Sequence, residues 1–311
     1  MRIFDNPNVN FIRWRWHALA LSILVIAAGL YTIVARGGLP LGVDFSGGTV
    51  LRLKFEKPTS ESAVRAALPF ARDAVVQTYG AADANEILVR LPMTGTDERT
   101  AVDEEAARVE AAIRGANLGN FTIESKEIVG PVIGADLQRK GIWATVASLG
   151  GILAYIWFRF RLTFAVGAIA ATLHDVLVTL VFLTWFNYDL SLNVVAALLT
   201  ITGYSVNDTI VVFDRVRENQ RTAKREALET VVNRSVNQTL SRTIITAGTT
   251  FLAVVALYLF GGDVLEGLAF TLLVGIVTGT YSTVFIASAI AIILNPRHKD
   301  VPASAARPKR S

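Results

Sequence analysis

The chain has 311 residues, of which 52% are hydrophobic and 18% are charged, with a formal net charge of +4 and no cysteine. Soluble globular proteins average roughly 25% charged residues, so this composition indicates a membrane protein. The basic residues flank apolar runs instead of forming one basic face, which argues against nucleic-acid binding, and the lack of cysteine excludes disulfides and cysteine-based metal sites.

Six apolar runs are long enough to cross a membrane, whose hydrocarbon core of about 30 Å needs about 20 helical residues. They occupy residues 17–34, 141–158, 162–186, 190–213, 243–260 and 265–294. The first run is longer than the apolar part of a signal peptide and lacks a clear small-residue cleavage site, so we interpret it as an uncleaved anchor. We therefore predict a polytopic α-helical membrane protein with six transmembrane helices.

Lysine and arginine alternate between the connections of these runs. They occur before the first run, between the second and third, between the fourth and fifth, and in the tail, whereas the turns at 185–189 and 261–266 contain none. Because these residues collect on the cytoplasmic side, we expect both termini in the cytoplasm. The predicted plan is a cytoplasmic N-terminus and first helix at 1–36, an external domain at 37–136, helices two to six at 137–294 with a cytoplasmic loop at 214–241, and a disordered basic tail at 295–311.

The external segment has the pattern of a small α+β domain. Strands are predicted at 50–55, 74–79, 86–91 and 121–128, and helices at 60–68, capped by Ser60, and at 97–114. The order β-α-β-β-α-β is the ferredoxin-like arrangement. The segment has no nucleotide-binding loop, metal-spaced histidines or catalytic triad, so its role is either contact with a partner or passive cover of the helices.

Two charged residues stand out near the fourth and fifth runs. Asp208 lies five residues before the end of the fourth run, and Arg242 opens the fifth. An ionised side chain at mid-membrane costs roughly 2.5–3.5 kcal/mol, so it needs a partner, a watery cavity or a function. At helical spacing the face of Asp208 also carries Thr200, Tyr204 and Val211, and that of Arg242 carries Thr239, Thr246 and Thr249.

These faces predict a hydroxyl-lined proton path between the fourth and fifth helices. Asp208 and Arg242 are its main residues, with Asn207 and Thr243 beside them in the chain. Burial and a nearby arginine act in opposite directions on the proton affinity of a carboxylate, so a small movement can load or release a proton. The alternative is a structural ion pair whose hydroxyls bond to their own backbone.

A second polar pair, His174 and Asp175, lies near the middle or outer half of the third run. We include it in the predicted proton path, although such a pair can also serve only to hold helices together. Protons are the predicted coupling ion, and no cofactor or metal is expected because no nucleotide or metal motif is present.

Small residues mark two further candidate sites. In the sixth run Gly275, Gly279 and Ser282, preceded by Thr271, form a ridge that permits close approach of another helix, either from a partner or from the same bundle.

The second candidate is a domain hinge at the borders of the external domain. Asp44, Gly47 and Gly48 follow the first run, while Gly130 and Pro131 precede the second. Glycine permits sharp turns, and aspartate can cap one.

These motifs resemble those of the SecD/SecF family of bacterial export proteins, in order and over nearly the whole chain. The similar segments are residues 42–49 (GVDFSGGT), 129–134 (VGPVIG), 173–175 (LHD), 203–219 (GYSVNDTIVVFDRVREN) and 237–243 (NQTLSRT).

The resemblance implies a subunit of the RND-type transporter superfamily in the bacterial inner membrane. Such a subunit joins SecD, works with the SecYEG channel and uses proton flow to complete translocation of unfolded preproteins. The family's transmembrane aspartate then corresponds to Asp208 and its arginine to Arg242. Two other functions stay open: half of an RND-like lipid or small-molecule exporter, and a non-conducting scaffold.

The charged connection at 214–241 is expected to lie along the cytoplasmic surface. Amphipathic segments rich in basic residues bind anionic lipid at the membrane interface. Membrane lipid is therefore a further expected partner. Docking of the channel is a second role open to this segment.

Overall fold

The computed structural model describes residues 8–71, 74–79, 84–91, 98–129, 131–223 and 226–295. The chain divides into two compact units. The helical unit consists of Met1–Pro40, Thr145–Asp189 and Asn193–Ser311, and the sheet unit consists of Leu41–Ala144 and Leu190–Leu192.

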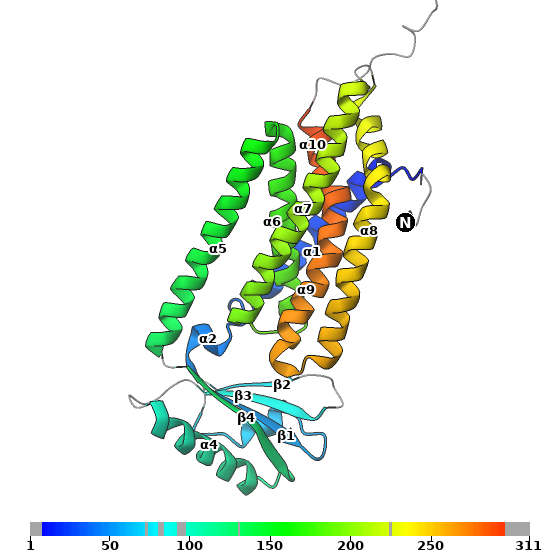
Figure 1. Cartoon of the computed structure of the whole chain (residues 1–311). Coiled ribbons are helices and arrows are strands. Elements are labelled where there is room, and N and C mark those ends of the chain that lie inside the picture. Colours follow the sequence, from blue (N-terminus) through cyan, green and yellow to red (C-terminus); the bar gives the residue numbers. More distant parts are fainter. Residues whose placement is uncertain are drawn as a thin grey trace, which may run out of the picture. The chain divides into compact units, whose positions relative to one another are not determined.

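The sheet unit follows the predicted order of elements (Figure 1). Its strands are β1 (Gly48–Phe55), β2 (Val75–Tyr79), β3 (Glu86–Leu91) and β4 (Phe121–Val129), and its helices are α2 (Val43–Ser46), α3 (Glu61–Ala66) and α4 (Glu98–Gly115). The strands pair antiparallel in the order β2-β3-β1-β4, with a register shift between Arg52 and Leu53 of β1. The predicted ferredoxin-like α+β arrangement is confirmed.

One face of this sheet forms the core of the unit. Leu51, Leu53 and Phe55 alternate along β1 and are buried, because successive side chains of a strand point to opposite faces. Val64 of α3 and Val109 of α4 belong to the same buried cluster, so both helices pack on that face. Before α3, the Ser60 hydroxyl accepts a hydrogen bond from the Ala63 backbone N–H at 3.2 Å, as its prediction as a helix cap requires.

The residues predicted as a hinge form the entry to the sheet unit. Gly47 and Gly48 have φ angles of 67° and 113°, in the left-handed region that glycine adopts without steric cost. The Asp44 carboxylate accepts a hydrogen bond from the Leu192 backbone N–H at 2.8 Å. The first amides of a helix lack partners inside it, so Asp44 caps the helix that begins at Leu192 instead of a local turn.

The exit from the sheet unit is less fully described. Gly130 lies outside the described residues, and Pro131 begins α5 (Pro131–Arg159). A Cβ atom on Gly134 would lie 3.2 Å from the backbone nitrogen of Gly47, so the two ends of the inserted domain pack closely. Whether this junction moves as a hinge stays a prediction.

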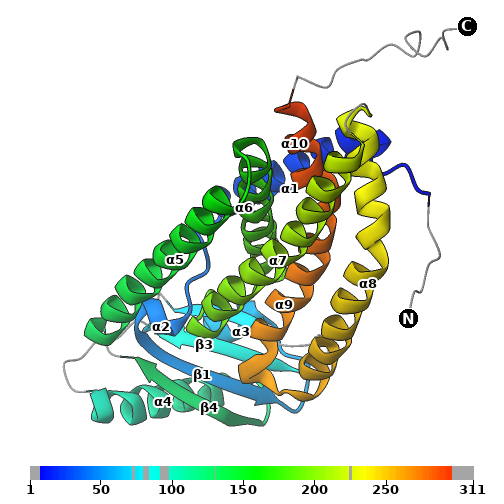
Figure 2. The ribbon, with the colours of Figure 1, turned by 45° about the horizontal axis from the view of Figure 1, so that its top comes forward.

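The long helices follow the six predicted spans (Figures 1 and 2). They are α1 (Arg15–Ala35) preceded by the 3-10 turn η1 (Ile12–Trp14), α5, α6 (Leu162–Trp185), α7 (Leu192–Thr222), α8 (Leu228–Phe260), and a last helix built from α9 (Asp263–Ser282), the π-helical turn η2 (Thr283–Ala287) and α10 (Ser288–Ile293). Among the described residues, six helices are thus long and apolar enough to cross a membrane.

Three helices form the centre of the helical unit and three its border. More than half of the apolar stretch is buried in α6 and in α9 with α10, and half in α7, whereas the values are 17% for α1, 6% for α5 and 17% for α8. In Figures 1 and 2, α6, α7 and α9 lie side by side between α5 and α8. A helix whose apolar side chains are mostly exposed must face lipid or a partner.

The connection between the fourth and fifth spans differs from the prediction. Residues 214–222 continue α7, residues 228–241 belong to α8, and only residues 223–227 separate the two helices. The expected loop at 214–241 is therefore mostly helical, and its position along the membrane surface stays a prediction.

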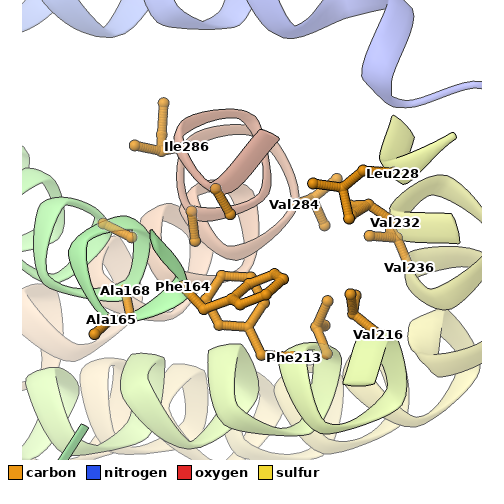
Figure 3. Close-up of a cluster of buried hydrophobic side chains, with 14 of the residues drawn as sticks. Phe164, Ala165, Ala168, Phe213, Val216, Leu228, Val232, Val236, Val284 and Ile286 are labelled. Carbon is orange, nitrogen blue, oxygen red and sulfur yellow. The ribbon is translucent and has the colours of Figure 1, made fainter. Parts of the chain in front are cut away.

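The reason is an apolar stripe that continues through the charged residues. Val216 of α7 and Leu228, Val232 and Val236 of α8 are buried in one cluster with Phe213 (Figure 3). Charge density had suggested a loop, but the buried face keeps the period of a helix.

Candidate functional site

Three side chains form hydrogen bonds with Asp175, on α6. It is fully buried. Its Oδ2 atom accepts hydrogen bonds from the hydroxyls of Ser205 on α7, at 2.5 Å, and Ser282 on α9, at 2.7 Å. Its Oδ1 atom lies 3.0 Å from Nδ1 of His174. Side chains from three helices therefore meet at one carboxylate.

A chain of hydrogen bonds extends this cluster to α1. His174 Nε2 lies 2.9 Å from the Ser22 hydroxyl, which lies 3.1 Å from the Tyr281 hydroxyl. The Tyr281 hydroxyl donates to the Ala18 carbonyl at 2.8 Å. We call Ser22, His174, Asp175, Ser205, Tyr281 and Ser282 the Asp175 network.

The direction of one bond in this chain is fixed by its acceptor. The Ala18 carbonyl can only accept, so the Tyr281 hydroxyl donates its one proton there and is left to accept from Ser22. The two ring nitrogens of His174 bond to Ser22 on one side and to Asp175 on the other, so the imidazole connects α1 to the carboxylate.

Asp208, on α7, has a different environment. It is 8% exposed and accepts a hydrogen bond from the Thr243 hydroxyl of α8 at 3.2 Å. Among the described residues, this is its one side-chain hydrogen bond with another side chain. Asn207, next to it in the chain, is exposed.

Arg242 is not where the sequence predicted it. It lies inside α8, not at the start of a helix, and its side chain is exposed. In the described part of the chain no ion pair joins it to Asp208, whose hydrogen bond comes from Thr243. The expected contact between acid and arginine is therefore replaced by Thr243, because adjacent residues of a helix point about 100° apart.

The threonine hydroxyls of the predicted proton path mostly form hydrogen bonds with carbonyls of their own helix. Thr239 donates to the Ser235 carbonyl at 3.0 Å, Thr246 to the Arg242 carbonyl at 3.0 Å and Thr249 to the Ile245 carbonyl at 2.9 Å. The alternative, in which the hydroxyls bond to their own backbone, therefore describes these threonines better than a hydroxyl-lined path does. Tyr204 differs, because its hydroxyl is buried without a hydrogen-bond partner among the described residues.

Helix α7 joins the two acidic sites. Ser205, which bonds to Asp175, and Asp208 are three residues apart and so lie on neighbouring positions of one helix face. Thr209 follows and forms a 2.9 Å hydroxyl bond with Thr283, the first residue of the π-helical turn η2. Such turns inside α-helices frequently occur at functional sites.

The ridge of small residues on α9 packs inside the chain and does not face a partner. A Cβ atom on Gly275 would lie 2.1 Å from Ile201 Cγ1, and one on Gly279 would lie 3.0 Å from Ser205 Cβ. Ser282 is fully buried beside Asp175. These residues let α9 approach α7 closely enough for the Asp175 network to form.

A third polar cluster, which was not predicted from the sequence, lies where the turn after α6 meets the start of the last helix. The Tyr188 hydroxyl donates to Glu266 Oε1 at 2.6 Å and lies 3.1 Å from the Tyr258 hydroxyl. Burial and the bond to the Glu266 carboxylate raise the pKa of the Tyr188 phenol, so it stays protonated and donates. The signal available was Glu266 itself, an acid at the start of an apolar run.

No group of three or more metal-binding side chains occurs in the part of the chain that the structure describes. The three polar clusters consist of carboxylates, hydroxyls and one imidazole, and carboxylates and imidazoles are groups that can take up and release protons.

Comparison with family models and known proteins identifies close similarity. Residues 108–297 match the model "Protein export membrane protein SecD/SecF, C-terminal", and residues 33–59 match the "SecD/SecF GG Motif". The second match covers the predicted hinge segment with Asp44, Gly47 and Gly48.

Similar proteins cover nearly the whole chain. Protein translocase subunit SecF of Desulfurispirillum indicum is 40% identical over 295 residues, which cover 93% of each chain. The SecF subunit of Rhodothermus marinus is 42% identical over 96% of each chain, and that of Escherichia coli O157:H7 is 39% identical over 93% of this chain and 89% of its own.

Solved structures show the same fold. The crystal structure of SecDF, a translocon-associated membrane protein from Thermus thermophilus, has a TM-score of 0.80 and 36% identity over 93% of this chain. A super-membrane-facing form of SecDF has a TM-score of 0.68. This chain spans 39% of the first SecDF chain, which is much longer.

Proposed function

Since the chain belongs to the SecD/SecF family of protein export membrane proteins, we propose that it acts with SecD to couple proton-motive force to late-stage translocation of preproteins through SecYEG. It is a multi-pass membrane protein, which we place in the bacterial inner membrane with both termini cytoplasmic. The role is that of a transport subunit and not of an enzyme.

The observation that supports proton coupling is the environment of Asp208. It is a buried carboxylate with one hydroxyl partner, and it lies on the helix that also bonds to the Asp175 network. A proton gained or lost at Asp208 changes the charge between α7 and α8, and α7 can pass a movement to Ser205 and Thr209. The proposed path thus consists of Asp208, Asn207, Thr243 and Arg242. His174 and Asp175 are connected to it through Ser205 of α7.

The energy of one proton is sufficient for such a movement. One elementary charge that crosses about 100 mV releases about 2.3 kcal/mol, which shifts a two-state equilibrium roughly fiftyfold.

The exposed side of α8 suggests how the path is completed. Leu252, Leu259 and Phe260 are exposed there, and Arg242 lies on the same helix, where its polar first part meets its apolar second part. An arginine at the edge of an apolar surface is favourable when a polar group of a partner covers it. We propose that SecD packs against α8 and supplies that group.

Replacement of Asp208 by Asn tests the proposal. The change preserves shape and removes the titratable proton, so assembly with SecD should continue while proton-dependent export falls at least about tenfold. The measurement is preprotein release from reconstituted vesicles, with and without a proton gradient. The matched control is Glu218→Gln, which removes an exposed carboxylate from the same helix and should leave export unchanged.

Two other outcomes favour the rival functions. Normal gradient-dependent export by Asp208→Asn, at wild-type protein levels, favours a non-conducting scaffold. Specific binding of apolar ligands by the purified chain, with no effect on preproteins, favours half of an RND-type lipid or small-molecule exporter.

A further inference from the structure

A large pocket lies between the turn that joins α5 to α6 and the hairpin of α7 and α8. Its volume is about 880 Å³. It is not part of the polar clusters described above. Its lining contains two kinds of side chain, arginines and large apolar residues, which bind different parts of an amphipathic molecule.

The arginines leave an excess of positive charge in this pocket. Arg159 bonds to Asp214 at 2.7 Å and is therefore neutralised. Arg161, Arg217 and Arg221 are exposed and form no ion pair within the described part of the chain. Among the described residues of the lining, the one acid is Glu226, which pairs with Arg234 at 2.9 Å.

Large apolar side chains line the rest of the pocket. Phe164 and Phe213 stack edge to face with ring centroids 5.1 Å apart, and Leu228 lies in the same buried cluster (Figure 3). Phe158, at the edge of the pocket, is 95% exposed on the border helix α5. The apolar surface therefore continues from the pocket to the outside of the bundle.

The pocket lies at the ends of two membrane spans. One span ends at Arg159 and the next begins at Leu162. Residues at such positions meet the headgroup region of a bilayer, where the polar part of a lipid lies next to its acyl chains.

From this combination we propose that the pocket binds one anionic phospholipid, with its phosphate on Arg161, Arg217 and Arg221 and its acyl chains along Phe158 and the apolar lining. Basic pockets between transmembrane helices bind lipid headgroups in this way. Guanidinium groups suit phosphate because their planar donors form paired hydrogen bonds with it.

Charge argues against two other assignments. The chain's own C-terminal segment cannot neutralise the arginines, because it contains Arg297, Lys299, Arg307, Lys309 and Arg310 against one acid, Asp300. A second pocket of similar volume is lined by Arg13, Arg15 and Arg234 among others, but Arg15 pairs with Glu229 at 2.7 Å and Arg234 pairs with Glu226. It has less unbalanced charge to attract a phosphate.

The test uses the full-length chain in nanodiscs of phosphatidylglycerol and phosphatidylcholine. After mild extraction, native mass spectrometry counts the lipids retained on each protein molecule. The wild type should retain one phosphatidylglycerol in preference to phosphatidylcholine. The variant Arg161→Gln/Arg217→Gln/Arg221→Gln should lose that preference, by about fivefold for each arginine removed.

Two control variants separate charge from folding. Arg161→Lys/Arg217→Lys/Arg221→Lys keeps the charge and should retain most of the preference. Arg13→Gln/Arg108→Gln removes exposed arginines outside the pocket and should behave as the wild type.

Three results would overturn the proposal. One is equal retention of phosphatidylglycerol by the wild type and the glutamine variant. Another is binding of millimolar inorganic phosphate by the wild type, lost in the glutamine variant, with no phosphatidylglycerol retained by either, which would identify a free-anion site. The third is unchanged lipid retention by the glutamine variant together with loss of its binding to the SecYEG channel, which would identify a protein-docking surface.

Discussion

Asp175 and Asp208 are both buried carboxylates in the helical unit, yet their surroundings differ. Asp175 interacts with His174, Ser205 and Ser282, from two neighbouring helices and its own. Asp208 has one hydroxyl partner, Thr243, at a longer distance. A buried group whose hydrogen bonds are all made stabilises one arrangement of helices. A group with few hydrogen bonds breaks few of them when its protonation state changes.

The comparison suggests a division of roles. The Asp175 network holds α1, α6, α7 and α9 together. Asp208 lies between α7 and α8, and α8 is mostly exposed. We therefore expect Asp175 to maintain the bundle and Asp208 to respond to the proton gradient.

The largest effect is expected from replacing each aspartate with alanine. Asp175→Ala leaves His174, Ser205 and Ser282 buried without their common partner, so it should reduce the free energy of unfolding by about 3–5 kcal/mol. Asp208→Ala should reduce it by about 1 kcal/mol. Thermal unfolding in the same detergent measures both, and equal losses would contradict the division of roles.

A smaller effect is expected at the helix contact that supports Asp175. Gly279→Ala places a methyl group 3.0 Å from Ser205 Cβ and pushes α7 away from Asp175, which should cost about 1–3 kcal/mol. Gly203→Ala is the control, because no atom beyond its own turn of helix lies within 4 Å of its Cβ position. That variant should be neutral or stabilised by up to about 1 kcal/mol. Similar melting temperatures for the two would mean that α9 does not position Ser205.

The smallest effects come from single hydroxyls and distinguish stability from function. Ser282→Ala removes one of two bonds to Asp175 Oδ2 and should cost about 1–2 kcal/mol with little change in gradient-dependent export. Thr243→Val removes the bond to Asp208 and should cost about 0.5–1 kcal/mol while export changes severalfold.

Thermal unfolding and gradient-dependent export, measured on the same preparations of Ser282→Ala and Thr243→Val, test this prediction. If Ser282→Ala lowers export more than Thr243→Val at equal protein levels, the responsive site is the Asp175 network, and the proposed roles are reversed.

Much of the architecture could be predicted from local patterns. Runs of about 20 apolar residues indicated the six spans, and alternation indicated the strands of the sheet unit together with the cap at Ser60. The lengths of α7 and α8 could not, because their buried stripe passes through the charged residues around Val216 and Val232. A count of charges detects the charged face of such a helix and not its buried one.

The polar sites show the same limit. The sequence singled out Asp208 correctly as a buried acid, but it placed Arg242 beside it and gave Asp175 less weight. It also gave no reason to connect Asp44 with Leu192 or Tyr188 with Glu266.

The sequence by itself therefore determined the number of spans, the order of elements in the inserted domain and the positions of the buried acids, since these depend on residues close together in the chain. Only the tertiary structure decided which acid receives the hydrogen bonds. Ser22 lies 152 residues from His174, and Ser282 lies 107 residues from Asp175. Such partners meet only after the helices have packed, and the rotation of each helix about its axis decides which side chains face one another.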